Sequence, residues 1–65
     1  MDPVEELNNI VLDSQLPIAK RKEAMLKLKN FYLTDDLRKL LSSIATNTSV
    51  PFEIRQMASD RLTKK

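Results

Sequence analysis

The sequence predicts an all-α protein: four helices arranged as two tandem antiparallel hairpins. Three observations support this prediction. Apolar residues recur at helical spacing, helix-start residues precede the apolar stripes, and the chain matches itself at an offset of 34 residues. With 65 residues, 42% of them hydrophobic, the chain can form only one small core, so we expect residues 1–65 to be a single helical domain.

The first hairpin is expected at about residues 2–31. Asp2 followed by Pro3 is typical of a helix start, with the aspartate as N-cap and the proline in the first turn. Pro17 then opens a second helix that extends to about Asn30. Because the chain has no glycine, Asn30 is expected to end this helix in a left-handed conformation.

The second hairpin is expected at about residues 35–65. Thr34 is the predicted N-cap of the third helix, which carries the most regular apolar stripe of the chain. A polar loop follows, in which Asn47 is the second candidate for a left-handed residue. Pro51 then opens a fourth helix that reaches about Thr63.

The match of the chain to itself indicates a duplicated unit. Residues 2–31 align without gaps on residues 36–65, and seven of these 30 positions are identical, against about two expected by chance. The identities lie at a helix start, on two apolar stripes and at the proline that opens the second helix of each hairpin. The identical pairs are Asp2/Asp36, Leu7/Leu41, Ile10/Ile44, Pro17/Pro51, Arg21/Arg55, Ala24/Ala58 and Leu28/Leu62.

In the second helix of each hairpin, this duplication gives the pattern Pro-x-x-x-Arg-x-x-Ala-x-x-x-Leu. The pattern resembles the B helix of a HEAT-type repeat, particularly the short HEAT-like variety. The resemblance implies two stacked hairpins and an aspartate near the turn, a place that Asp13 fills as a partner for Arg21 and that Asn47 occupies in the second hairpin. Because solenoids usually have three or more repeats, a closed four-helix bundle of the same hairpins is the alternative.

Arg21 and Arg55 are predicted to have a structural role. Each lies near the middle of the apolar arc of its helix, where a charge must be paired or must extend over the core to water or to a helix C-terminus. We therefore expect both arginines to anchor neighbouring helix ends rather than to bind a ligand.

The composition argues against an enzyme. Histidine, cysteine and glycine are absent, which excludes imidazole dyads, thiol nucleophiles, zinc sites and glycine-rich phosphate loops. We expect no cofactor and no metal. The acidic start and the short apolar runs match neither a secretory signal nor a membrane span, so the expected setting is soluble and intracellular, in the cytoplasm.

Charge is segregated along the chain and indicates a contact surface. Residues 1–19 carry four acids and no base, whereas residues 20–29 carry five bases and one acid, and residues 54–65 carry four bases and one acid. The second helices of both hairpins are therefore basic, and in a HEAT-like stack they would form one outer face, with the repeat-equivalent Lys27 and Arg61 side by side. The candidate contact residues on this face are Lys20, Glu23, Lys27, Asn30, Ile54, Met57, Arg61 and Lys64.

Two function classes follow from this surface, and self-association as a homodimer is a third. The first is a small adaptor or inhibitor that binds a protein partner, because exposed Ile54 and Met57 beside charges are typical of protein contacts. Short non-catalytic chains are also frequent among accessory subunits and viral modulators. The alternative is a nucleic-acid-binding regulator, although the three aromatic residues are expected in the core. Its basic residues would be Lys20, Lys22, Lys27, Arg61, Lys64 and Lys65.

Overall fold

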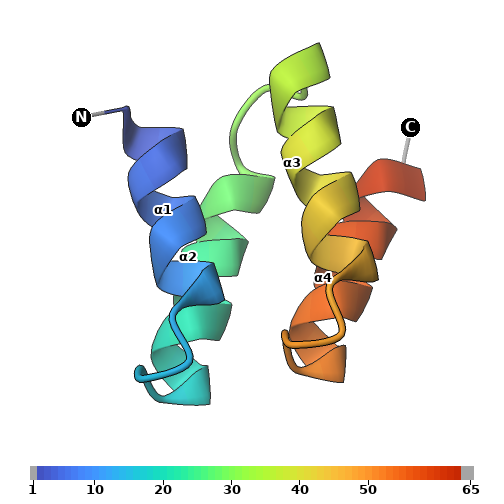
Figure 1. Ribbon diagram of the computed structural model, residues 1–65. Helices are drawn as coiled ribbons and strands as arrows, with labels where there is room; N and C mark the ends of the chain where they lie inside the picture. Colours follow the sequence, from blue (N-terminus) through green and yellow to red (C-terminus); the bar gives the residue numbers. More distant parts are fainter. Residues whose placement is uncertain (1, 64–65) are drawn as a thin grey trace.

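The structure, a computed structural model, describes residues 2–63. It contains α1 (Pro3–Leu12), α2 (Ile18–Lys29), α3 (Asp35–Thr46) and α4 (Phe52–Thr63), and the described residues include no strand. The prediction of an all-α protein is therefore confirmed. We refer to α1 with α2 as the first hairpin and to α3 with α4 as the second hairpin (Figure 1).

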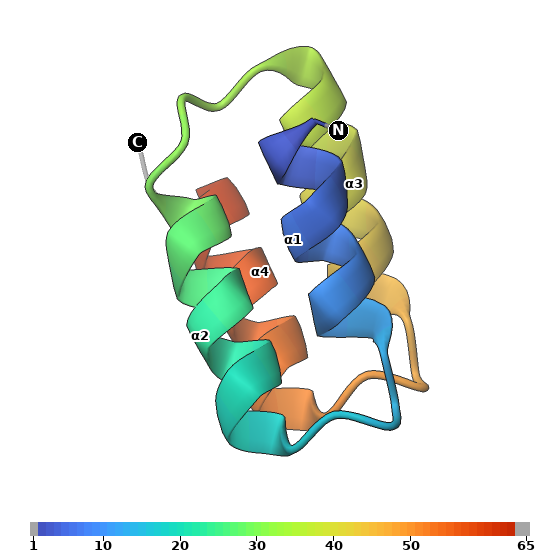
Figure 2. The same ribbon diagram turned by 90° about the vertical axis from the view of Figure 1, so that its left-hand side faces the viewer.

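The two hairpins lie side by side in two layers. α1 packs against α2 and α3 against α4, whereas the hairpins meet mainly through α2 and α4, with a smaller contact between α1 and α3. Figure 2 shows α1 and α3 in one layer and α2 and α4 in the other, and the two helices of each layer run in the same direction. The second hairpin therefore has the same orientation as the first.

Side-chain caps begin the first helix of each hairpin. The carboxylate of Asp2 accepts a hydrogen bond of 2.9 Å from the backbone N–H of Val4, and the hydroxyl of Thr34 accepts one of 3.1 Å from Leu37. Both predicted N-caps are confirmed. Such caps satisfy N–H groups that have no partner within the helix and stabilise it by about 1 kcal/mol.

The turns inside the two hairpins have equivalent hydrogen bonds. The Asp13 carboxylate accepts from the backbone N–H of Gln15 at 2.9 Å, and the Asn47 side-chain oxygen accepts from Ser49 at 2.9 Å. The predicted left-handed conformation is wrong for both asparagines: φ is −85° at Asn30 and at Asn47, and no residue among 2–63 has a positive φ. A side-chain oxygen that holds the turn makes a left-handed residue at position 47 unnecessary.

The core contains apolar side chains from all four helices. Full burial of a valine, leucine, isoleucine or methionine side chain stabilises the fold by about 1.5–3 kcal/mol relative to leaving it exposed. Both hairpins therefore depend on one shared core. The buried apolar residues are Val11, Ala24, Met25, Leu28, Leu37, Leu41, Ile44, Val50, Ile54 and Ala58.

Two of the three aromatic residues lie outside this core. Tyr32 is 86% exposed and Phe52 is 66% exposed, so their predicted burial is wrong, whereas Phe31 packs against the core in part. Tyr32 follows the last turn of α2, where helical spacing no longer determines direction. Phe52 begins α4, and the Arg55 guanidinium carbon lies 5.6 Å from the centre of its ring.

Candidate interaction surface

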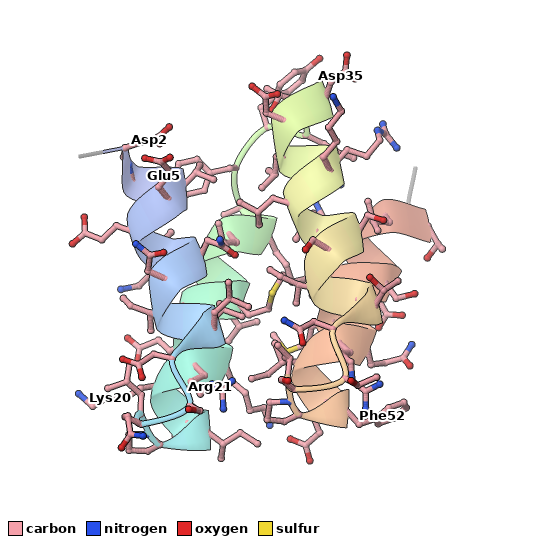
Figure 3. The ribbon with its side chains drawn as sticks, in the orientation of Figure 1. Asp2, Glu5, Lys20, Arg21, Asp35 and Phe52 are labelled. Carbon is pink, nitrogen blue, oxygen red and sulfur yellow. The ribbon has the colours of Figure 1, made fainter. Side chains whose placement is uncertain are left out.

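A groove lies between α1 and α2. It encloses a volume of about 300 Å³ and is lined by Leu7 and Ile10 from α1, Leu16 from the turn, and Lys20, Glu23, Ala24 and Lys27 from α2. We call these seven residues the first-hairpin groove. Figure 3 shows Lys20 at the edge of the first hairpin, away from α3 and α4.

The second hairpin has the same surface, but there it is covered. Each residue of the first-hairpin groove has an equivalent 34 positions later, and all of these equivalents except Arg61 belong to the core or pack against it. The first hairpin packs over them through α2. Of the equivalents, Leu41, Ile44, Val50, Ile54 and Ala58 are buried, and Met57 and Arg61 are half-buried.

The predicted single outer face of α2 and α4 is divided in the structure. Ile54, expected to be exposed, is 0% exposed, because α2 covers this side of α4. Met57 and Arg61 are half-buried, and the Arg61 Nε donates to the backbone carbonyl of Lys29 on α2 at 3.2 Å. Lys27 lines the first-hairpin groove, so Lys27 and its equivalent Arg61 belong to different surfaces.

The other candidate contact residues also differ in their surroundings. Lys20 and Glu23 lie in the first-hairpin groove, and Asn30 is exposed at the C-terminal end of α2. The Lys27 ammonium lies 3.7 Å from the Glu23 carboxylate, one helical turn away. Lys64 lies outside the described residues. The structure therefore brings Lys20, Glu23 and Lys27 together and leaves Asn30 at the helix end.

Arg21 links the two helices of the first hairpin. It is 6% exposed, and its Nε donates to the backbone carbonyl of Val11 at 2.9 Å. Val11 lies in the last turn of α1, whose final carbonyls have no partner within the helix. The carboxylate of Asp13, expected beside Arg21, instead accepts the turn hydrogen bond from Gln15.

Arg55 does not reach the equivalent carbonyl in the second hairpin. Its Nε donates to the backbone carbonyl of Val50 at 3.0 Å, only five residues earlier, and its guanidinium lies over Phe52. The prediction that Arg55 anchors the neighbouring helix is therefore wrong. The Arg55 guanidinium packs on the aromatic ring of Phe52, at the start of α4. Arg21 lacks such a partner, because the equivalent residue in the first hairpin is Ile18.

The basic residues of the nucleic-acid alternative are also dispersed. Lys22 donates to the Glu53 carboxylate of α4 at 2.8 Å and is thereby engaged between the hairpins. This hydrogen bond, together with the positive charge of Lys22, lowers the pKa of Glu53 below its ordinary value. Lys64 and Lys65 lie outside the described residues. The described basic residues therefore form no single ridge.

The side of the second hairpin that faces away from the first is polar. Three of its residues, on α4, are equivalent to residues 22, 25 and 29 of α2, the side of α2 that meets α4, and all five are serine, glutamine, threonine or arginine. All are exposed except Ser59, which is half-buried. We call Arg38, Ser42, Gln56, Ser59 and Thr63 the outer side of the second hairpin.

A second groove, of about 510 Å³, was not foreseen from the sequence. It lies where the N-terminal ends of α1 and α3 meet the connection between the hairpins, and Figure 3 shows Asp2 and Glu5 at the start of α1. Helix starts favour carboxylates, so capping accounts for its acidic residues. Its residues are Asp2, Val4, Glu5, Phe31, Tyr32, Thr34, Asp36, Leu37 and Leu40.

Comparisons with protein-family models, with curated proteins and with solved structures give no match. Within residues 2–63, no three acidic side chains are grouped closely enough to hold a metal ion, and no helix has the length and apolar character of a membrane span.

Proposed function

We propose that this chain is a non-catalytic interaction module, built from two HEAT-like hairpins, which binds a protein partner through the first-hairpin groove. The observation that carries the proposal is the equivalence between this groove and the covered surface of the second hairpin. The same kind of surface that stabilises the contact between the hairpins is open on the first hairpin. A partner that covers it would act by docking, as in an adaptor or an inhibitor.

The difference between the two sides of the molecule supports this proposal. The outer side of the second hairpin is polar, as expected for a surface that stays in water at the end of a stack. The first-hairpin groove instead keeps Leu7, Ile10 and Leu16 half-buried between charged residues. A small apolar centre with a charged rim is typical of protein contacts.

Nucleic-acid binding has weaker support. Stable binding to phosphates requires several cations close together. Among the described residues, Lys22 is paired with Glu53 and Lys27 with Glu23, which leaves Lys20 as the groove lysine without an acidic partner. A protein partner therefore fits the groove better than a nucleic acid does.

Affinity capture from the cells that make the protein tests this function. The decisive variant carries Lys20→Glu with Lys27→Glu, and the matched control carries Arg38→Glu with Lys39→Glu, two exposed positions of α3 outside both grooves. We expect a protein that is retained by the wild type and by the control, is lost with the groove variant and is unaffected by nuclease. Retention that does not respond to the groove variant, or nucleic acid bound at about 150 mM salt, would contradict the proposal.

A further inference from the structure

We propose, building on the protein-binding function above, that the first-hairpin groove binds an acidic amphipathic α-helix of the partner, oriented parallel to α2. The groove of the second hairpin shows what occupies a surface of this shape, and the two charged residues that replace apolar ones, Lys20 and Glu23, indicate the charge of the occupant.

A helix covers the equivalent groove of the second hairpin. Met25 is fully buried and lies on the same stripe of α2 as Lys22 and Lys29. Both of these residues contact α4, since the Lys22 ammonium lies 2.8 Å from Glu53 and the Lys29 carbonyl accepts from Arg61. A helix with an apolar side chain between two polar flanks is therefore the natural occupant of this surface.

The first-hairpin groove has the same net charge as the covered one but differs from it in the placement of charged residues. Lys20 stands where the second hairpin has Ile54, and Glu23 replaces a methionine. Lys27 keeps the positive charge of its equivalent, Arg61, and is paired with Glu23. Lys20 has no ion pair among residues 2–63, so an occupant would need a carboxylate opposite Lys20.

The contact of Arg61 also indicates the direction of the bound helix. Arg61 donates to the carbonyl of Lys29, at the C-terminal end of α2, where carbonyls lack helical partners. Lys27 has the equivalent position and would face the C-terminal end of the occupant. Lys20, about two turns earlier, would then face its N-terminal half, where the helix dipole favours acidic side chains.

A second copy of this chain fits the groove less well than an acidic helix. Head-to-tail stacking would place the outer side of the second hairpin on the first-hairpin groove. This outer side offers serine, glutamine, threonine and arginine, and the adjacent carboxylate of Asp60 already accepts a hydrogen bond of 2.9 Å from Gln56. Self-association is therefore an outcome that the test must be able to detect.

The probe is a synthetic peptide with the sequence of residues 17–30, changed by Lys22→Glu and Lys29→Glu so that two carboxylates flank Met25. A hydrocarbon linker between positions 23 and 27, away from the contact stripe, holds the peptide helical, because short isolated helices are marginal in water. The matched control peptide has the same linker and keeps both lysines. Binding is followed by NMR shifts of the isotope-labelled full chain.

We expect the glutamate peptide to shift the backbone signals of Leu7, Ile10 and Ala24. It should bind about tenfold more tightly than the lysine peptide at low salt, because Lys20 and Lys27 attract its carboxylates and repel the lysines of the control. In the variant Lys20→Glu with Lys27→Glu, the preference should reverse in favour of the lysine peptide. The Arg38→Glu with Lys39→Glu control should keep the wild-type preference. If the groove variant does not fold, Lys20→Gln with Lys27→Gln should remove the preference.

Equal affinity for the two peptides, or shifts centred away from the groove, would overturn the inference. So would a concentration-dependent dimer in sedimentation that the groove variant abolishes, because the occupant would then be a second copy. The outcome is separable from the proposed function. If the groove variant loses the captured partner but neither peptide binds the wild type, only the acidic helix is ruled out. If the groove variant reverses the peptide preference but still captures the partner, only the proposed function is ruled out.

Discussion

The Nε of Arg21 donates a 2.9 Å hydrogen bond to the backbone carbonyl of Val11, and both residues are buried. This contact joins the middle of the apolar arc of α2 to the last turn of α1. It gives a hydrogen-bond partner to a carbonyl that has none within α1, and it gives the buried guanidinium an acceptor that reduces the cost of its burial. One charged side chain thereby links the two helices of the first hairpin.

Arg21→Ala should therefore destabilise the protein more than Arg55→Ala. We expect a loss of about 2 kcal/mol in the free energy of unfolding for Arg21, because a buried hydrogen bond to a charged group is removed, and about 1 kcal/mol for Arg55, whose contacts are local. Urea unfolding followed by circular dichroism measures both variants. Equal losses would show that the Val11 contact has no special weight.

Substitutions of Ile54 test whether this side chain is buried, as the structure shows, or exposed, as the sequence predicted. Ile54→Val should cost about 0.5–1.5 kcal/mol and Ile54→Ala about 2–5 kcal/mol, since this side chain is fully buried. Tyr32→Ala, at a highly exposed position, should change stability by less than about 0.5 kcal/mol. Thermal unfolding of the three variants gives the comparison. A harmless Ile54→Ala would contradict the packing of α2 over α4.

The equivalent turns predict equivalent responses to substitution. Asp13→Asn should be tolerated, because the amide oxygen of Asn47 makes the same hydrogen bond in the second hairpin. Asp13→Ala and Asn47→Ala should each cost about 1 kcal/mol, the usual value for one such bond. Denaturant unfolding tests this series, and a large loss for Asp13→Asn would indicate that the charge matters rather than the oxygen.

The ion pair between the hairpins predicts a dependence on pH. Because Lys22 lowers the pKa of Glu53 in the folded state, the pair stabilises the fold at pH values above the ordinary pKa of glutamate, and this contribution is lost as the pH falls through the lowered value. Lys22→Met should raise the pKa of Glu53 toward its ordinary value in an NMR titration of the Glu53 carboxyl carbon. Lys39→Met is the control and should leave it unchanged.

The sequence predicted the helices well because their signals are local. Pro17 and Pro51 each lie directly before a helix, Thr34 caps α3, and the offset of 34 residues relates both ends of α2 to those of α4. α3 starts two residues earlier than the repeat requires, at Asp35, because Thr34 supplies the cap there. Caps and prolines act within one turn, so the sequence specifies them directly.

The surface was harder to predict because burial depends on the neighbouring hairpin. Equivalent positions have different surroundings: the second hairpin is covered on the side where the first is open, so Ile54 is buried while Lys20 is exposed. The residue differences between the two repeats did indicate which surface is buried. Charged Lys20 and Glu23 become apolar Ile54 and Met57, as expected when one copy of a repeated surface is buried and the other is not.

Short connections join each helix to its closest neighbour within a hairpin, across residues 13–17 and 47–51. Small loops of this kind close first, at little entropic cost, and we expect the chain to fold within about microseconds to milliseconds. The helices that join the hairpins, α2 and α4, share the buried residues on which both depend. Neither hairpin can lose its structure without exposing the apolar residues of the other, so the two halves should melt in one cooperative transition.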